Sequence, residues 1–255
     1  MIMKKILINI SNGFSLRYLC HSEILKTFLE NKKIKVYVLS NNSEATKKNL
    51  KIEKITYLQY DEKKIKDYQI SSKIYNFLES LRLYVHGGNF STPSVMFNYL
   101  RIKKKKKFFL KLLIFFCKKI YLIRKLLIFV QSKYYPKNLY SMIEELKPDL
   151  ILTSSLGVFR YDDYVLRIAR VLGIKSFSCI LSWDNSTTRG YPGAVPSYIF
   201  SWTKIMTREL VQFSDCNKKK IFEGGIAHFD NYYNNKIAKF DIKKKFNISE
   251  NKKII

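Results

Sequence analysis

The sequence of 255 residues is poor in glycine, proline, cysteine and acidic side chains. With 9 Gly and 5 Pro, it is neither collagen-like nor a flexible linker. Its 4 cysteines lie far apart without a Cys-x-x-Cys pair, and its 3 histidines do not cluster. The sequence therefore predicts no metal site and no disulfide framework, and the reduced cytoplasm is the expected environment.

The apolar residues are numerous enough to build a core. They make up 47% of the chain, which excludes general disorder, and the length allows one large α/β unit or two small ones. Lys and Arg number 47 against 20 Asp and Glu, a formal charge of +27. Such a charge favours anionic membranes, nucleic acids or phosphorylated ligands without choosing among them.

Short apolar runs alternate with helical patterns along most of the chain. Strands are expected at residues 6–10, 35–40, 55–58, 149–153, 176–181, 198–201 and 220–222, and helices at 16–30, 138–146 and 163–172. Asp162 or Asp163 is expected to cap the last of these helices, and Gly13 to permit a tight turn. The pattern predicts a Rossmann-like, doubly wound α/β domain over residues 1–247, with a mainly parallel sheet and ligands beyond the carboxyl ends of its strands.

Residues 101–131 form a basic amphipathic segment inside this domain. Lysines within it make membrane spanning unfavourable, at roughly 2.5–3.5 kcal/mol for each one near the bilayer centre. Two interpretations stay open: a long helix packed on its own domain with the lysines in water, or a helix at an anionic membrane surface. The lysines that would contact lipid headgroups are Lys103, Lys107, Lys111, Lys118 and Lys125.

The most distinctive loop, residues 182–190, follows an apolar strand. It gathers an indole, a carboxylate, an amide, hydroxyls and a guanidinium, the groups that bind sugars and phosphate esters. The alternative is a turn in which Asp184 and Asn185 bond to local backbone amides. We favour binding, because α/β folds place their sites in polar loops at strand ends.

The motif in this loop resembles a known one. Ser182-Trp183-Asp184-Asn185, followed by Thr187, Thr188, Arg189 and Gly190, is similar to the Ser-Trp-Asp-Asn-Leu-Thr-Ser-Lys-Gly motif of GT-B-type bacterial glycosyltransferase-like proteins, which are related to surface-polysaccharide glycosyltransferases and CDP-glycerol glycerophosphotransferases. Ser186 replaces the usual leucine and Arg189 the usual lysine. Further similar elements are Arg17-Tyr18-Leu19, Asp162-Asp163, Trp202 with Glu209, and residues 224–230.

The resemblance implies a GT-B enzyme with two Rossmann-like halves that face each other across a cleft. The amino-terminal half would bind a sugar or polyol-phosphate acceptor, and the carboxyl-terminal half the nucleotide-activated donor. Residues 248–255 look like the start of that second half, with residues 251–255 as the opening of its first strand. We therefore expect this sequence to hold only the acceptor half and to lack a cofactor of its own. The implied activity is transfer of a sugar or glycerol phosphate in cell-envelope polysaccharide or glycolipid synthesis, at the cytoplasmic face of the membrane, with a separate carboxyl-terminal half as a further partner.

Two candidate bases could deprotonate an acceptor hydroxyl, namely Asp184 in the loop motif and His228 in the similar segment near residue 230. The expected acceptor-binding residues are Asn12, Arg17, Trp183, Asn185, Thr187 and Arg189. The glycines form neither Gly-x-Gly-x-x-Gly nor a Walker pattern, so no phosphate-binding loop is predicted.

A second function class is a non-catalytic basic α/β protein that binds nucleic acid or a membrane. Nucleic acid is the less favoured partner, because the aromatic residues do not alternate with basic ones as in RNA-binding signatures. The lysine-rich segment is also too apolar for a solvated arm.

Overall fold

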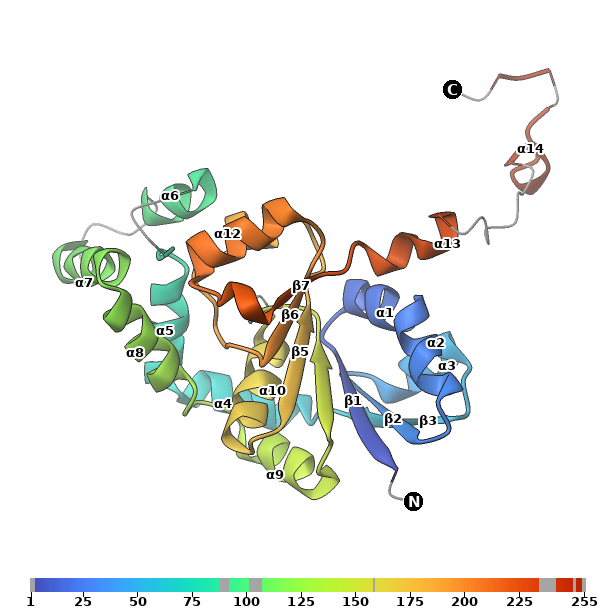
Figure 1. The fold of residues 1–255 in the computed structure, drawn as a ribbon, viewed down its shortest axis with the longest axis horizontal. Coiled ribbons are helices and arrows are strands. Elements are labelled where there is room, and N and C mark those ends of the chain that lie inside the picture. The colour runs from blue at the N-terminus through green and yellow to red at the C-terminus, as the bar shows by residue number, and fades with distance from the viewer. Residues whose placement is uncertain are drawn as a thin grey trace.

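The computed structural model describes residues 3–87, 92–100, 107–157, 159–233, 242–249 and 251–253. In this part of the chain, a seven-stranded sheet has the order β3-β2-β1-β4-β5-β6-β7, and every pair of neighbours is parallel (Figure 1). The strands are β1 (Lys4–Ile10), β2 (Ile34–Ser40), β3 (Ile55–Gln59), β4 (Leu150–Thr153), β5 (Lys175–Cys179), β6 (Tyr198–Ser201) and β7 (Ile221–Glu223). The predicted Rossmann-like, doubly wound α/β fold is confirmed.

Helices flank this sheet on both faces (Figure 1). In the amino-terminal half they are α1 (Gly13–Cys20), α2 (Glu23–Glu30), α3 (Ser43–Leu50), α4 (Glu62–Ser71), α5 (Lys73–Arg82), α6 (Pro93–Leu100), α7 (Lys107–Lys119) and α8 (Tyr121–Gln131). They continue with α9 (Lys137–Leu146), α10 (Arg160–Val171), α11 (Asn185–Thr188), α12 (Lys204–Ser214), α13 (Asp230–Tyr233) and α14 (Ile242–Lys245), and two short 3-10 helices span Lys218–Lys220 and Ala227–Phe229.

Alternate residues of β1 face the two layers of helices. Ile6 and Ile8 pack in the same buried cluster as Leu19 of α1 and Leu25 of α2. Leu7, between them, packs instead with residues of α9 and α10. Because successive strand residues point to opposite faces, a strand covered on both sides reads as a continuous apolar run, as β1 does.

The strand order reverses between β1 and β4, which pair directly with Ile6 opposite Leu150. From β1 the chain moves outward through β2 to β3, and then returns to the other side of β1 to form β4. The chain segments leaving β1 and β4 therefore diverge. In open α/β sheets such a reversal opens a crevice at the carboxyl ends of the strands.

The predicted helix over residues 16–30 is wrong as a single element. Ser22 divides it into α1 and α2, because its hydroxyl accepts a hydrogen bond from the Ile24 backbone N–H and donates one to the Tyr18 carbonyl. Serine is a strong N-cap and readily starts a new helix. The capping roles predicted for Asp162 and Asp163 are wrong too: α10 begins at Arg160, and both carboxylates lie buried in its first turn.

The single long helix expected in residues 101–131 is also wrong. Residues 101–106, which include Lys103, lie outside the described residues, and α7 and α8 are separated at Ile120. The Arg124 guanidinium donates two hydrogen bonds back to α7, to the carbonyls of Cys117 and Lys118 at 3.0 and 2.7 Å. Arg124 also pairs with Asp215 at 2.6 Å. This side chain therefore satisfies the last carbonyls of α7 and fixes the break.

Two other expectations concern the ends of elements. Gly13 starts α1 without a left-handed backbone, and a Cβ there would meet open space, so no tight turn requires this glycine. In the predicted strand opening at 251–255, residues 251–253 contain a turn and a bend and no strand, whereas residues 254 and 255 lie outside the described residues. Among the described helices, none is long and apolar enough to cross a membrane.

Candidate functional site

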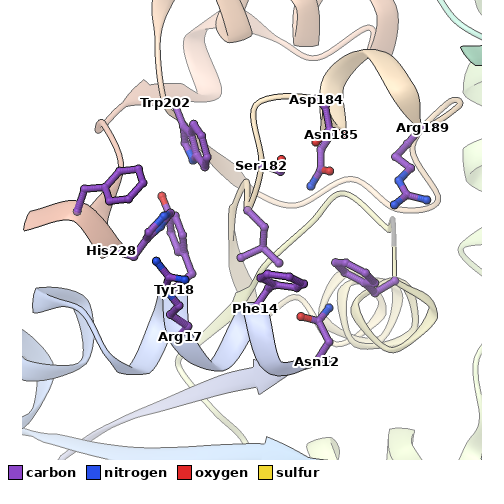
Figure 2. Close-up of a pocket in the computed structure, with 13 residues that line it drawn as sticks. Asn12, Phe14, Arg17, Tyr18, Ser182, Asp184, Asn185, Arg189, Trp202 and His228 are labelled. Atoms are coloured by element: carbon purple, nitrogen blue, oxygen red, sulfur yellow. The ribbon is translucent and has the colours of Figure 1, made fainter. Parts of the chain in front are cut away.

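A cavity of about 690 Å³ lies at the carboxyl edge of the sheet, next to the reversal between β1 and β4. Segments that follow β1, β4, β5, β6 and β7 all line it. Figure 2 shows side chains of α1 along one side and those of the loop after β5 along the other. Six of the eight predicted site residues line this cavity: Asn12, Arg17, Asp184, Asn185, Arg189 and His228.

The α1 side of the cavity is built on the end of β1. Asn12 caps α1, because its side-chain carbonyl accepts a hydrogen bond from the Ser15 backbone N–H at 3.0 Å and its own N–H donates to Ser15 Oγ at 2.9 Å. Arg17 follows from the next turn and is exposed. Phe14, between them, lines the cavity with 74% of its surface exposed. This side thus presents an amide, a guanidinium and an apolar ring.

The opposite side is the loop after β5 and the short helix α11. The Asp184 carbonyl accepts hydrogen bonds from the backbone N–H groups of Thr187 and Thr188, and Asp184 Oδ2 accepts one from Thr188 Oγ1 at 3.2 Å. These bonds differ from those of the alternative interpretation, because the backbone carbonyl of Asp184 accepts from the amides while its side chain makes no capping hydrogen bond. The side chains of Asp184, Asn185 and Arg189 nevertheless line the cavity. The turn that forms α11 therefore also forms this wall of the cavity.

The two tryptophans differ in their placement. Trp183 is 72% exposed and does not line the cavity. Trp202, directly after β6, does line it, and its indole N–H donates a 2.7 Å hydrogen bond to the Ile180 carbonyl. Thr187 also lies off the cavity, with its carbonyl accepting a hydrogen bond from Thr92 Oγ1 at 2.6 Å. Sequence reasoning assigned acceptor binding to Trp183, whereas Trp202, one residue after the neighbouring strand β6, is the tryptophan that lines the cavity.

His228 closes one end of the cavity, between aromatic side chains (Figure 2). Its ring centroid lies 5.3 Å from that of Tyr18, 6.0 Å from that of Trp202 and 4.2 Å from that of Phe229. Burial and the nearby Arg17 lower the pKa of His228 below its usual 6.5. Its Nδ1 is buried and has no hydrogen-bond partner among the described residues. At neutral pH the ring is therefore mostly uncharged, as a proton acceptor must be.

Two buried contacts that sequence reasoning missed hold the loop after β5. His86 Nε2 donates a 2.9 Å hydrogen bond to the Arg189 carbonyl, and burial lowers the pKa of His86. Ser186 Oγ donates a 2.5 Å hydrogen bond to Oε2 of Glu209 on α12. The partners in each contact are far apart in the sequence. The resemblance, which includes Glu209, was the one signal for the second contact. Both residues act through the loop and do not line the cavity.

A buried polar network fixes the edge of the sheet beneath the cavity. Asn9, at the end of β1, donates to Asp162 Oδ1 at 2.6 Å, and its own side-chain carbonyl accepts a bond from the Tyr60 hydroxyl. Ser154 and Ser155 donate to Asp162 Oδ2 at 2.9 and 2.7 Å. Burial raises the pKa of Asp162 to about 6, an effect that these donors partly offset. The network joins the ends of β1 and β4 to α10.

The adjacent residue, Asp163, belongs to a second buried network. Its Oδ2 lies 3.4 Å from Arg82 and 3.5 Å from Arg167, and both guanidinium groups also pair with Glu79. Burial and the Glu79 carboxylate raise the pKa of Asp163. A Cβ at Gly193 would lie 2.1 Å from Asp163 Oδ1, so this glycine is required by close packing. The network joins α5 to α10 behind the cavity.

The remaining titratable groups offer no metal site. The part of the chain that the structure describes has no group of three or more His, Cys, Asp or Glu side chains that could hold a metal ion. His21 is exposed and bonds to Asn49 Oδ1 at 3.0 Å.

Comparisons with known proteins assign no family to the chain. No protein-family model and no curated protein matches the sequence. Among solved structures, the chain is similar to a protein described as the carbonyl reductase Sniffer of Caenorhabditis elegans, at 12% identity over 74% of this chain and 89% of that chain. The TM-score is 0.25, so this likeness carries no argument about function.

Proposed function

We propose that this chain is the acceptor-binding half of a GT-B-type glycosyltransferase-like enzyme of cell-envelope polysaccharide or glycolipid synthesis. Its cavity binds a sugar or polyol phosphate whose hydroxyl attacks a nucleotide-activated donor. The observation that carries the proposal is the composition of one cavity of about 690 Å³, in which apolar rings, two amides and two guanidinium groups converge. The resemblance of residues 182–190 to the glycosyltransferase-like motif supports it independently.

Each type of group in the cavity suits one part of such an acceptor. The rings of Phe14, Trp202 and Phe229 offer apolar faces for the carbon side of a sugar or polyol. The side chains of Asn12 and Asn185 can pair with hydroxyls. Arginine binds phosphate through a planar fork of N–H donors, so Arg17 and Arg189 are suited to a phosphate group.

His228 is the base that the geometry favours over Asp184. Its lowered pKa keeps the imidazole uncharged at neutral pH, and it stands among rings that exclude water from one side. Asp184, already bonded to Thr188, would hold acceptor hydroxyls in place. In this scheme the acceptor proton passes to His228 as the acceptor oxygen bonds to the sugar or glycerol phosphate of the donor. The bond between that group and the donor's nucleotide phosphate breaks, and the nucleotide leaves with the electron pair.

Transfer also needs a donor site, which in this proposal lies on a second Rossmann-like half facing the cavity. Acceptor binding needs only the residues described above. The two steps can therefore be tested separately, and binding is tested first.

Tryptophan fluorescence provides the test, because the chain has 2 Trp. In a Trp183→Phe variant, Trp202 is the single reporter, and titration with sn-glycerol 3-phosphate or glucose 1-phosphate should give a saturable change. An apparent Kd of about 1 mM is expected, and Asp184→Ala or Arg17→Ala should weaken binding at least about fivefold, the loss of one charged hydrogen bond.

The matched control is Trp202→Phe, which leaves the exposed Trp183 as reporter and should give no saturable change. Sodium sulfate at equal ionic strength controls for screening. If neither compound produces a saturable signal from Trp202, the acceptor-binding function is wrong.

A further inference from the structure

The outer surface of α7 and α8 is strongly apolar. Phe108 and Leu122 are 83% and 74% exposed, and Phe109, Phe115, Leu126 and Phe129 are each at least half exposed. The opposite side of the same two helices is also apolar: Ile114, Leu127 and Ile128 are buried against α5 and Tyr191. The helices are therefore fixed to the body of the molecule while they hold a second apolar face outward.

Positive charge surrounds this apolar face. Between Glu79 and Glu144 the sequence contains lysines and arginines but no acidic residue. On the described helices, Lys111 and Lys119 are exposed, and the Nζ of Lys125 lies 5.0 Å from the centroid of the Tyr121 ring. Arg124 is the exception, since it turns inward to Asp215. Cationic groups on an exposed apolar surface match a bilayer that offers anionic headgroups above hydrocarbon.

Other occupants fit this face less well. A second copy would bring two basic surfaces together without acidic residues between them, a repulsive arrangement. Nucleic acid would neutralise the lysines but leave the phenylalanine and leucine side chains in water. A bilayer surface takes up both kinds of group at once.

We infer that the α7–α8 face, defined by the exposed side chains of Phe108, Phe115, Leu122, Leu126, Lys111 and Lys119, is a docking surface for anionic lipid bilayers. The helices lie on the membrane and do not cross it, because no described helix is long enough to span. The inference does not depend on the proposed acceptor function.

The docking surface is connected to the cavity wall through α6. The Nζ atoms of Lys111 and Lys118 both lie 5.6 Å from the centroid of the Tyr99 ring on α6. Thr92, just before α6, donates the 2.6 Å hydrogen bond to Thr187 of α11. Helix α6, which lies beside α7 (Figure 1), therefore contacts both the docking surface and α11 of the cavity wall.

Vesicle cosedimentation of the full chain tests the inference. Phosphatidylcholine vesicles with 30% phosphatidylglycerol should bind the protein, and pure phosphatidylcholine vesicles should bind it at least about tenfold more weakly. The Phe108→Ser/Leu122→Ser variant removes apolar contacts at exposed positions, so its fold should be retained, as circular dichroism can check. It should lower the partition coefficient at least about tenfold.

The test of the lysines needs a control variant with the same change in net charge. Lys111→Glu/Lys119→Glu should lower binding to anionic vesicles at least about tenfold, whereas Lys47→Glu/Lys48→Glu, on exposed positions of α3 at the other side of the molecule, should change it less than about twofold (Figure 1). Equal losses in the two variants would show a non-specific charge effect and overturn the inference. So would tight DNA binding without vesicle binding, or a dimer that the Phe108→Ser/Leu122→Ser change dissociates.

Discussion

The Ser186 hydroxyl donates a hydrogen bond of 2.5 Å to Oε2 of Glu209, and this bond joins α11 to α12. Helix α11 has four residues and no side-chain cap, so it gains little stability from its own backbone. Asp184 and Asn185, the two residues before Ser186, line the cavity. A polar contact to a distant helix therefore holds the cavity wall in place, at a position where the resembling motif has leucine.

Replacing Ser186 with alanine should lower the free energy of unfolding by about 1–2 kcal/mol, because a partly buried hydrogen bond from the buried Ser186 to a charged group is lost. Urea denaturation followed by far-ultraviolet circular dichroism measures this change. Ser141→Ala is the control: Ser141 is exposed and bonds to the Lys137 carbonyl at 3.2 Å, so its loss should cost less than about 0.5 kcal/mol. Equal costs at the two sites would show that the Ser186 contact contributes nothing.

The titration of His228 should respond to Arg17. Burial and the Arg17 charge lower the pKa of His228, so Arg17→Ala should move that pKa upward, toward 6.5. Proton NMR of the imidazole C–H signals measures the change directly, and with 3 His in the chain the signals can be assigned by single substitutions. In the proposed transfer reaction, the loss of rate at acid pH should begin at a higher pH in the variant than in the native protein.

Two internal controls accompany this titration. The pKa of His86 is lowered by burial, with no contribution from Arg17, and it should stay unchanged in Arg17→Ala. Arg208→Ala, an exposed substitution on α12, should leave both values where they are. A His228 pKa that does not move when Arg17 is removed contradicts the predicted interaction.

Asp162 should make the protein less stable as the pH rises toward neutrality. Its pKa in the folded state, about 6, lies above the value of 3.8 expected in the unfolded chain, so the folded state binds the proton more tightly. The stabilisation is complete below pH 3.8 and is lost as the pH rises through about 6. At about 1.4 kcal/mol for each unit of pKa, the loss amounts to about 3 kcal/mol.

Asp162→Asn removes this titration, so the stability difference between the native protein and the variant should shrink by about that amount between pH 4 and pH 7. Asp149→Asn is the control with the opposite sign. A hydrogen bond from Lys4, with a second from the Lys5 backbone, lowers the pKa of Asp149, so its contribution is lost only at acid pH. Between pH 5 and pH 7 the stability difference between the native protein and Asp149→Asn should therefore be constant. If the stability difference between the native protein and Asp162→Asn is constant as well, the predicted pKa shift of Asp162 is wrong.

Most strands could be predicted from sequence because each is a short, largely apolar run between polar turns. The expected strand at 198–201 matches β6, and the run at 35–40 is one residue shorter than β2. Gly173, directly after the predicted helix over 163–172, has a left-handed φ of 68° just past the end of α10. These features are set by local sequence, and glycine is the residue best suited to that conformation.

The break between α7 and α8 could not be predicted, since it depends on a partner far along the chain. Nothing near Ile120 marks a helix end, and the break follows from an arginine held by Asp215, 91 residues away. The cavity shows the same limit. The motif located the loop after β5, but only the folded chain shows that Trp202 lines the cavity while Trp183 does not.

The two consecutive carboxylates of α10 belong to different networks. Asp162 bonds forward to Asn9 at the edge of the sheet, whereas Asp163 lies sideways between Arg82 and Arg167. The first turn of α10 thus joins the ends of β1 and β4, beneath the cavity, to α5, which packs against α7 and α8. A tilt of α10 would disrupt both sets of bonds together, so the position of this one helix sets both the ends of β1 and β4 and the placement of α5.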